Sequence, residues 1–144
     1  MEKVTIKDFG ERIAQDCTGP FAESKVLPDA KERVVAGMIW AHPGRAKPIP
    51  ITALTAATGW NAREIKGIVE QLVVTHRMKI GGRRGEPGGY FRIVDAEDQE
   101  AAVRPYRDQI FSMWRRLRVL MGKHRLAELA GQLAMSVDEE EQGE

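Results

Sequence analysis

The sequence predicts an α+β protein that is mainly helical, with a long helical extension toward its C-terminal end. Apolar residues recur at helical spacing in four segments, which begin near Asp29, Ile51, Asn61 and Asp95. Between the third and fourth segments, the runs MKI and YFRIV carry the β-branched and aromatic residues typical of strands. A glycine-rich run, GGRRGEPGG, joins these two runs and predicts a β-hairpin.

Length and composition limit the broad class. A chain of 144 residues suffices for one domain with an extension and can bury a hydrophobic core. No apolar run approaches the roughly 18 residues of a transmembrane helix, and the N-terminal residues lack the apolar segment of a signal peptide. The single cysteine, Cys17, excludes an internal disulfide. We therefore expect a cytoplasmic protein with no membrane partner.

Residues 1–27 are expected to form an N-terminal arm. Its residues 4–17 have the spacing of a short amphipathic helix, which either binds a partner or folds back on the core. The first helix of the domain follows Asp29, a plausible N-cap with Glu32 in the position required for a capping box. Three prolines within residues 43–50 exclude a helix and predict a loop leading into a short extended segment.

A tight turn is predicted between the second and third helices at Gly59, because glycine readily adopts the positive φ that such a turn needs. Asn61 can cap the third helix, and the apolar residues within 65–72 predict that one of its faces is buried. The opposite face then carries Arg63 and Lys66 near the N-terminal end. Two cations there suit a helix that enters a DNA groove.

Positive charge concentrates in the same region. Residues 31–60 have a net charge of +3 and residues 61–92 a net charge of +4, whereas residues 93–144 have a net charge of −4. Within the hairpin, Arg83 and Arg84 are expected at the tip, where they can reach phosphate groups or a minor groove. This asymmetry favours a polyanionic partner.

The C-terminal extension is predicted to be helical over residues 95–135, with Asp95 as its N-cap. Pro105 either kinks this helix or marks a second start. Apolar residues spaced three and four apart from Val103 to His124 form a heptad seam, which either packs within the chain or joins two copies. Residues 136–144 are acidic and are predicted to be disordered. The candidate dimerisation residues are Tyr106, Ile110, Met113, Trp114, Leu117 and Leu120.

Patterns that would indicate catalysis are weak. The three histidines, His42, His76 and His124, lack metal-ligand spacing to one another or to Cys17. The glycine-rich run leads into a strand, whereas a phosphate-binding loop opens a helix. We therefore expect neither an enzyme nor a metal site, and no cofactor or small-molecule substrate.

The segments LTAATGWNAREIKGIVEQL, GEPGGYFRIV and YRDQIFSMWRRLRVL resemble the winged helix-turn-helix DNA-binding superfamily, in particular its small members from phages, prophages and bacterial regulators. The resemblance covers about two-thirds of the chain and implies a winged-helix domain at residues 28–94, with a three-helix core and a β-hairpin wing. Thr55 departs from the pattern, because a small residue usually stands there. The candidate DNA-binding residues are Thr52, Asn61, Ala62, Arg63, Lys66, Lys79, Arg83 and Arg84.

The sequence thus predicts a protein that binds double-stranded DNA as a homodimer. Its role would be that of a transcriptional regulator or of a phage-type replication or recombination accessory protein. The alternative is a protein–protein adaptor of the same fold, because winged helices also serve as interaction modules.

Overall fold

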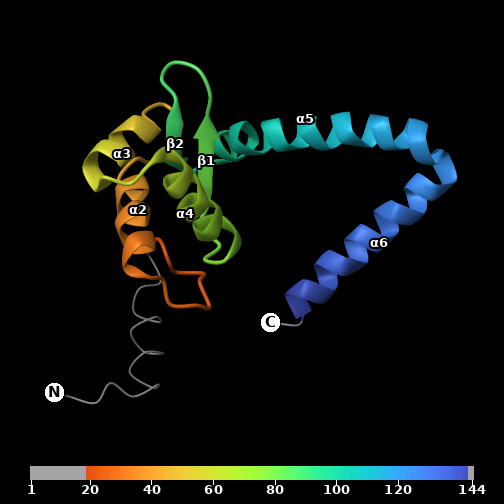
Figure 1. The fold of residues 1–144 in the computed structure, drawn as a ribbon, viewed down its shortest axis with the longest axis horizontal. Coiled ribbons are helices and arrows are strands. Elements are labelled where there is room, and N and C mark those ends of the chain that lie inside the picture. Colours follow the sequence, from red (N-terminus) through yellow and green to blue (C-terminus); the bar gives the residue numbers. More distant parts are fainter. Residues whose placement is uncertain (1–18, 143–144) are drawn as a thin grey trace, which may run out of the picture. The chain divides into compact units, whose positions relative to one another are not determined.

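The computed structural model describes residues 19–142, which form five helices and one antiparallel hairpin (Figure 1). The protein is mainly helical with a small sheet, in agreement with the predicted α+β class. The helix predicted within residues 4–17 lies outside the described residues. In chain order the elements are α2 (Ala30–Trp40), α3 (Ile51–Thr58), α4 (Ala62–Val74), β1 (Ile80–Arg83), β2 (Gly89–Arg92), α5 (Ala96–Met121) and α6 (Lys123–Gln142).

The predicted caps fix where the helices begin. The Asp29 side chain accepts a hydrogen bond from the Glu32 N–H at 2.7 Å, and the Glu32 carboxylate accepts one from the Asp29 N–H, so the capping box before α2 is confirmed. Asp95 likewise accepts from the N–H of Asp98 at the start of α5. Each contact satisfies a backbone donor that has no partner within its helix.

A hydrophobic core lies among α2, α3 and α4. Helix α2 packs against α4, and α3 contributes Leu54 to the same cluster. Figure 1 shows the three helices gathered beside the hairpin, whose loop projects beyond its two strands. The buried apolar residues of this cluster are Val35, Ala36, Ile39, Ile49, Leu54, Ile65, Val69, Leu72 and Met78.

The hairpin begins two residues later than the predicted run MKI. Strand β1 pairs with β2 in a register that places Gly81 opposite Phe91. A side chain at Gly81 would come within 2.3 Å of the Phe91 ring, so the buried phenylalanine requires a glycine across from it. Met78, expected in the strand, is buried in the core instead.

A third extended segment flanks β2, as the proline-rich loop predicts. The backbones of Ile49 and Tyr90 exchange two hydrogen bonds, of 2.8 and 2.9 Å. Gly89 adjoins this contact with φ +137°, and a Cβ there would come within 2.1 Å of the Ile49 carbonyl oxygen. Glycine is therefore required at residue 89 both for its backbone conformation and for the close approach of the loop.

The chain divides into two units, one ending at Val103 and the other beginning at Arg104. The sequence places this boundary at residue 94, but the first residues of α5 belong to the first unit, where Asp98 and Ala102 are buried. Helix α5 continues through Pro105 without a second start. Among the described residues, no helix is both long enough and apolar enough to span a bilayer.

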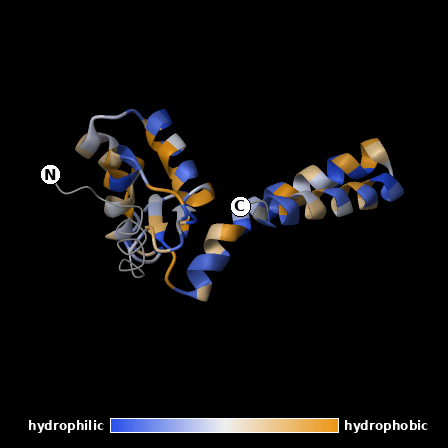
Figure 2. Ribbon diagram, turned by 90° about the horizontal axis from the view of Figure 1, so that it is seen from below, coloured by the Kyte–Doolittle hydropathy of each residue, from blue (hydrophilic) through white to orange (hydrophobic). Residues whose placement is uncertain are grey.

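Two predictions about the second unit are wrong. The heptad seam does not run unbroken to His124, because Gly122 adopts φ +81° and ends α5. The acidic tail is not disordered up to residue 142, because α6 continues to Gln142. Glutamate is a good helix former, so a run of acidic residues can extend a helix that has already begun. Figure 2 shows apolar and polar residues alternating along α5 and α6.

Candidate nucleic-acid interface

Helix α4 carries the central part of the predicted interface. Gly59 adopts the left-handed conformation, with φ 77°, and the Asn61 side chain accepts a hydrogen bond from the Glu64 N–H at 2.9 Å. Ile65, Val69 and Leu72 are buried. Because these three residues fix which face of α4 packs inward, they also fix which face meets solvent.

The outward face of α4 is cationic near its N-terminal end. Arg63 and Lys66 are exposed, as are Gly67 and Glu70. A Cβ on Gly67 would have no neighbour within 4 Å, so the helix backbone is open to approach there. Neither Arg63 nor Lys66 makes a hydrogen bond or ion pair with any residue that the structure describes. Both charges are therefore available to a partner.

The one acidic residue in the first turn of α4 is neutralised. Glu64 forms an ion pair with Lys31 of α2, and the Lys31 ammonium lies 5.0 Å from the centre of the Trp60 ring. Trp60 itself packs on the core. Sequence spacing could not reveal the pair, because its members are 33 residues apart. This end of α4 therefore presents little uncompensated negative charge to an anionic ligand.

The hairpin cations differ from one another. Arg83 is in β1 rather than at the tip, and its guanidinium donates a 2.9 Å hydrogen bond to the Arg45 carbonyl. Arg84 is exposed in the loop and has no such partner among residues 19–142. Lys79 is exposed and lies 4.0 Å from the Glu23 carboxylate. Arg84 is therefore the hairpin cation that is free to bind a ligand.

The remaining predicted DNA-binding residues are neutral. Thr52 is exposed in the first turn of α3, and Ala62 is exposed as the first residue of α4. Asn61 is exposed, but its side-chain oxygen is engaged by the helix cap. Of these three side chains, Thr52 offers its hydroxyl to a ligand and Asn61 offers the hydrogens of its amide.

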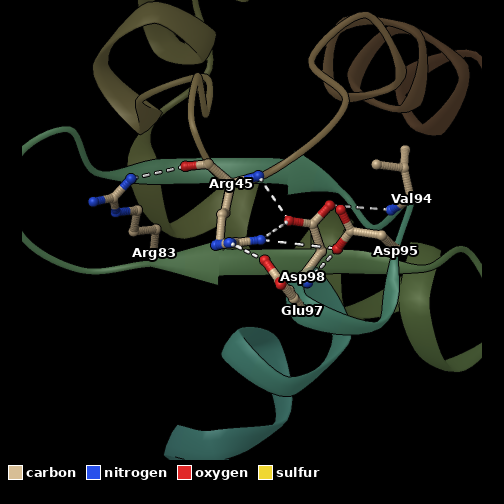
Figure 3. Close-up of polar contacts among 6 residues, drawn as sticks. All are labelled: Arg45, Arg83, Val94, Asp95, Glu97 and Asp98. Atoms are coloured by element: carbon tan, nitrogen blue, oxygen red, sulfur yellow. Dashed lines mark hydrogen bonds and ion pairs between the residues drawn. The ribbon is translucent and has the colours of Figure 1, made fainter.

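A second polar cluster, which the sequence did not reveal, holds the base of the hairpin (Figure 3). Asp98 is only 1% exposed and accepts hydrogen bonds from the Arg45 N–H, from the Arg45 guanidinium at 2.8 Å and from the Val94 N–H. The same guanidinium donates to Glu97 at 2.8 Å. The Arg45 carbonyl also accepts a hydrogen bond from Arg83. The loop between α2 and α3, which contains Arg45, therefore joins the hairpin to the start of α5.

The charge state of Asp98 follows from these contacts. Burial alone would raise its pKa, but the hydrogen bonds from Arg45 and Val94, together with the positive charge of Arg45, outweigh burial and lower the pKa. Hydrogen bonds to Glu97 and Asp98 raise the pKa of Arg45 in turn. The buried carboxylate therefore remains ionised near neutral pH.

A buried polar group ties residues 19–28 to the helices. The Ser24 hydroxyl donates to the Val26 carbonyl at 2.7 Å and lies 2.8 Å from His76 Nδ1, while His76 Nε2 contacts the Glu32 carboxylate. The Ser24 hydroxyl is thus within hydrogen-bond distance of both the Val26 carbonyl and the His76 ring. Phe21 also packs edge-on against the His76 ring. The group thus joins three segments distant in sequence.

The predicted dimerisation residues all lie in the second unit. Tyr106, Ile110, Met113 and Leu120 are exposed. Trp114 and Leu117 are half-buried. A continuous apolar surface is therefore left open on α5.

Comparisons with protein-family models, curated proteins and solved structures found no match for this chain. The functional argument therefore rests on the residues and their geometry.

Proposed function

We propose that this protein binds double-stranded DNA as a winged helix-turn-helix protein, with α4 in the major groove. The observation that carries the proposal is the outward face of α4, where Arg63 and Lys66 are exposed and form no ion pair or hydrogen bond with residues 19–142. A helix and its side chains fit the major groove, and an arginine there can donate two hydrogen bonds to guanine. The helix is supported from behind by its buried apolar face, as a recognition helix must be.

The hairpin is the wing in this proposal. Arg84 lies on the projecting loop and would contact the phosphate backbone, which fixes the orientation of a protein on the duplex without reading sequence. Arg83 would act indirectly, since its bond to the Arg45 carbonyl sets the angle of the hairpin. The pairing of Arg45 with Asp98 and Glu97 also offsets one of the two negative charges beside the wing.

Two biological roles fit such an activity. A transcriptional regulator and a phage-type replication or recombination accessory protein both need sequence-directed binding to duplex DNA. Both would use the same cations, Arg63, Lys66 and Arg84, which have no partner in the part of the chain that the structure describes. Double-stranded DNA is therefore the ligand in both roles.

The second candidate function is that of a protein–protein adaptor, which the exposed apolar residues of α5 and α6 favour. Tyr106, Ile110 and Leu133 are each more than half exposed. An apolar surface of this kind is typical of an interaction site. An adaptor would bind its partner through this surface and would not depend on Arg63 or Lys66.

Fluorescence anisotropy with a labelled duplex of random sequence, titrated from low to moderate salt, tests the proposal. Wild-type affinity should fall linearly with salt on logarithmic axes, because bound phosphates release counterions. On a duplex of random sequence the two cations of α4 act mainly by neutralising phosphate charge, so the double variant Arg63→Ala and Lys66→Ala should reduce the magnitude of the slope by roughly 2. Arg84→Ala alone should lower it by about 1.

The matched control is Arg104→Ala with Arg115→Ala, which removes the same charge from exposed positions of α5 outside the first unit. This variant should keep the wild-type slope. If the α4 variant and the α5 control lose affinity equally, binding is a matter of net charge and the assignment of α4 is wrong. If wild type fails to bind duplex at low salt, the adaptor function is favoured instead.

A further inference from the structure

The second unit has an apolar face on α5 that extends over most of its length. At 100° per residue, most of the apolar residues from Tyr106 to Met121 fall on one side of the helix, and Ser112, Arg115 and the apolar Val119 fall on the other. Leu120 is 81% exposed and Tyr106 is 70% exposed. Covering this much exposed apolar surface lowers the free energy of the protein in water.

Helix α6 has a matching stripe. Leu126, Leu129, Leu133 and Val137 lie on one side of it at spacings of three and four. Leu126 is buried and Leu129 half-buried, whereas Leu133 and Val137 are more than half exposed. The stripe is thus covered near the turn at Gly122 and open farther from it.

On α5 a part of the apolar face follows the same gradient, although Leu120 beside the turn is 81% exposed. Trp114, Leu117 and Met121, which are close to the turn, are half-buried. Tyr106 and Ile110, which are farther away, are exposed. The two helices therefore leave open the apolar residues at the end of the unit remote from Gly122, together with Leu120 beside the turn.

Charge is distributed unequally along this unit. Residues 115–125, around the turn, contain five Lys/Arg and no acidic residue, whereas residues 138–141 are four consecutive acidic residues. Arg116, Arg118 and Arg125 flank the apolar face, and Arg115 lies on the opposite side. Within one chain these two regions are separated by most of the length of α6, about 20 Å at 1.5 Å per residue.

We propose that a second copy of this chain covers the apolar face, with the two α5–α6 arms antiparallel. Only the antiparallel arrangement brings the acidic end of each arm beside the cationic turn of the other. Two-fold symmetry forms this contact twice. In a parallel pair the five cations of one turn would lie beside the five of the other turn. Like charges oppose association.

The charges fit less well with α6 folding back onto α5 of the same chain. Folding α6 back along α5 would place residues 138–141 near residues 104–108, where Arg104 and Arg107 are offset by Asp108. The turn of the second copy offers five cations and no acid. This inference is independent of the DNA-binding proposal, because it concerns only residues of the second unit.

Sedimentation equilibrium on the full chain and on two charge-reversed variants tests the inference. One variant carries Arg116→Glu, Arg118→Glu and Arg125→Glu, and the other carries Asp138→Lys, Glu139→Lys and Glu140→Lys. Wild type should be dimeric at micromolar concentration. Each variant alone should dissociate at least roughly tenfold more readily, because like charges then meet at both contacts. A mixture of the two variants should restore the dimer as a heterodimer.

Each alternative gives a different result. A parallel dimer would leave each variant alone as stable as wild type, and intramolecular closure would give no heterodimer on mixing. Either result overturns the inference. A wild type that is still monomeric at about 100 μM, roughly the upper end of such assays, overturns it as well. Ile110→Asp and Leu133→Asp should each abolish the dimer, while Ser112→Asp, on the opposite side of α5, should not. Circular dichroism of each variant verifies that its helices are retained.

Discussion

The cluster around Asp98 allows a quantitative prediction about stability. Replacing Asp98→Ala removes the acceptor for two backbone N–H groups, those of Val94 and Arg45, and for the Arg45 guanidinium. A buried donor left without a partner costs about 1–3 kcal/mol. Arg45 keeps Glu97 as a partner and is 39% exposed, so its charge is not stranded. We expect a total loss of about 2–4 kcal/mol, somewhat less than the full cost of breaking a buried ion pair.

Urea denaturation followed by tryptophan fluorescence measures this loss. A Trp114→Phe background confines the signal to Trp40 and Trp60, both in the first unit. Glu97→Ala is the matched control, because it removes a carboxylate that binds the same guanidinium but is 79% exposed. An exposed pair contributes about 0–1 kcal/mol. The melting temperature should fall by at least about 8 °C for Asp98→Ala and by much less for the control.

The pH dependence gives a second arm of the same test. Because the folded protein lowers the pKa of Asp98, the ionised carboxylate contributes stability above the ordinary carboxyl pKa of about 3.9, and that contribution is lost as pH falls through the lowered value. The stability difference between wild type and Asp98→Asn should therefore be constant from neutral pH down to about pH 5 and then shrink below about pH 4. Equal losses of stability for Asp98→Ala and Glu97→Ala would refute the reasoning. So would a stability difference between wild type and Asp98→Asn that does not change at acid pH.

Two further predictions concern the backbone of the hairpin and the buried contact between Ser24 and His76. Gly89→Ala should destabilise the first unit by more than about 2 kcal/mol through clash and strain, whereas Gly67→Ala, in open space on α4, should stabilise it by roughly 0.5–1 kcal/mol. Thermal melts compare the two, and equal effects would contradict the close approach at Ile49. Ser24→Ala should cost about 1–3 kcal/mol by leaving the buried His76 Nδ1 without its hydrogen-bond partner, and urea unfolding beside the exposed control Ser136→Ala checks it.

Local chemistry determined what could be predicted from the sequence. The caps at Asp29, Asn61 and Asp95 and the left-handed Gly59 depend on residues within a few positions of one another, and all four were correct. The buried face of α4 also followed from spacing alone. These features need no knowledge of the tertiary fold.

The rest depends on contacts between distant residues. Arg45 and Asp98 are 53 positions apart, so their ion pair could not be found from a sequence pattern. The same is true of the hydrogen bond from Arg83 to the Arg45 carbonyl. The strand register was set by the ring of Phe91, which no propensity measures. Predicting Arg83 at the hairpin tip was wrong for this reason: the strand extends through both glycines before the turn.

The loop between α2 and α3 has a consequence for how the domain can vary in length. Gly44 and Ile49 bond to β2, Arg45 bonds to the start of α5, and its carbonyl receives Arg83. Because these attachments fall within six consecutive residues, an inserted or deleted residue would break several of them together. The loop at residues 84–88 carries no comparable set of tethers, so it is the place where this domain can accept additional sequence and where its reach over a ligand can be lengthened.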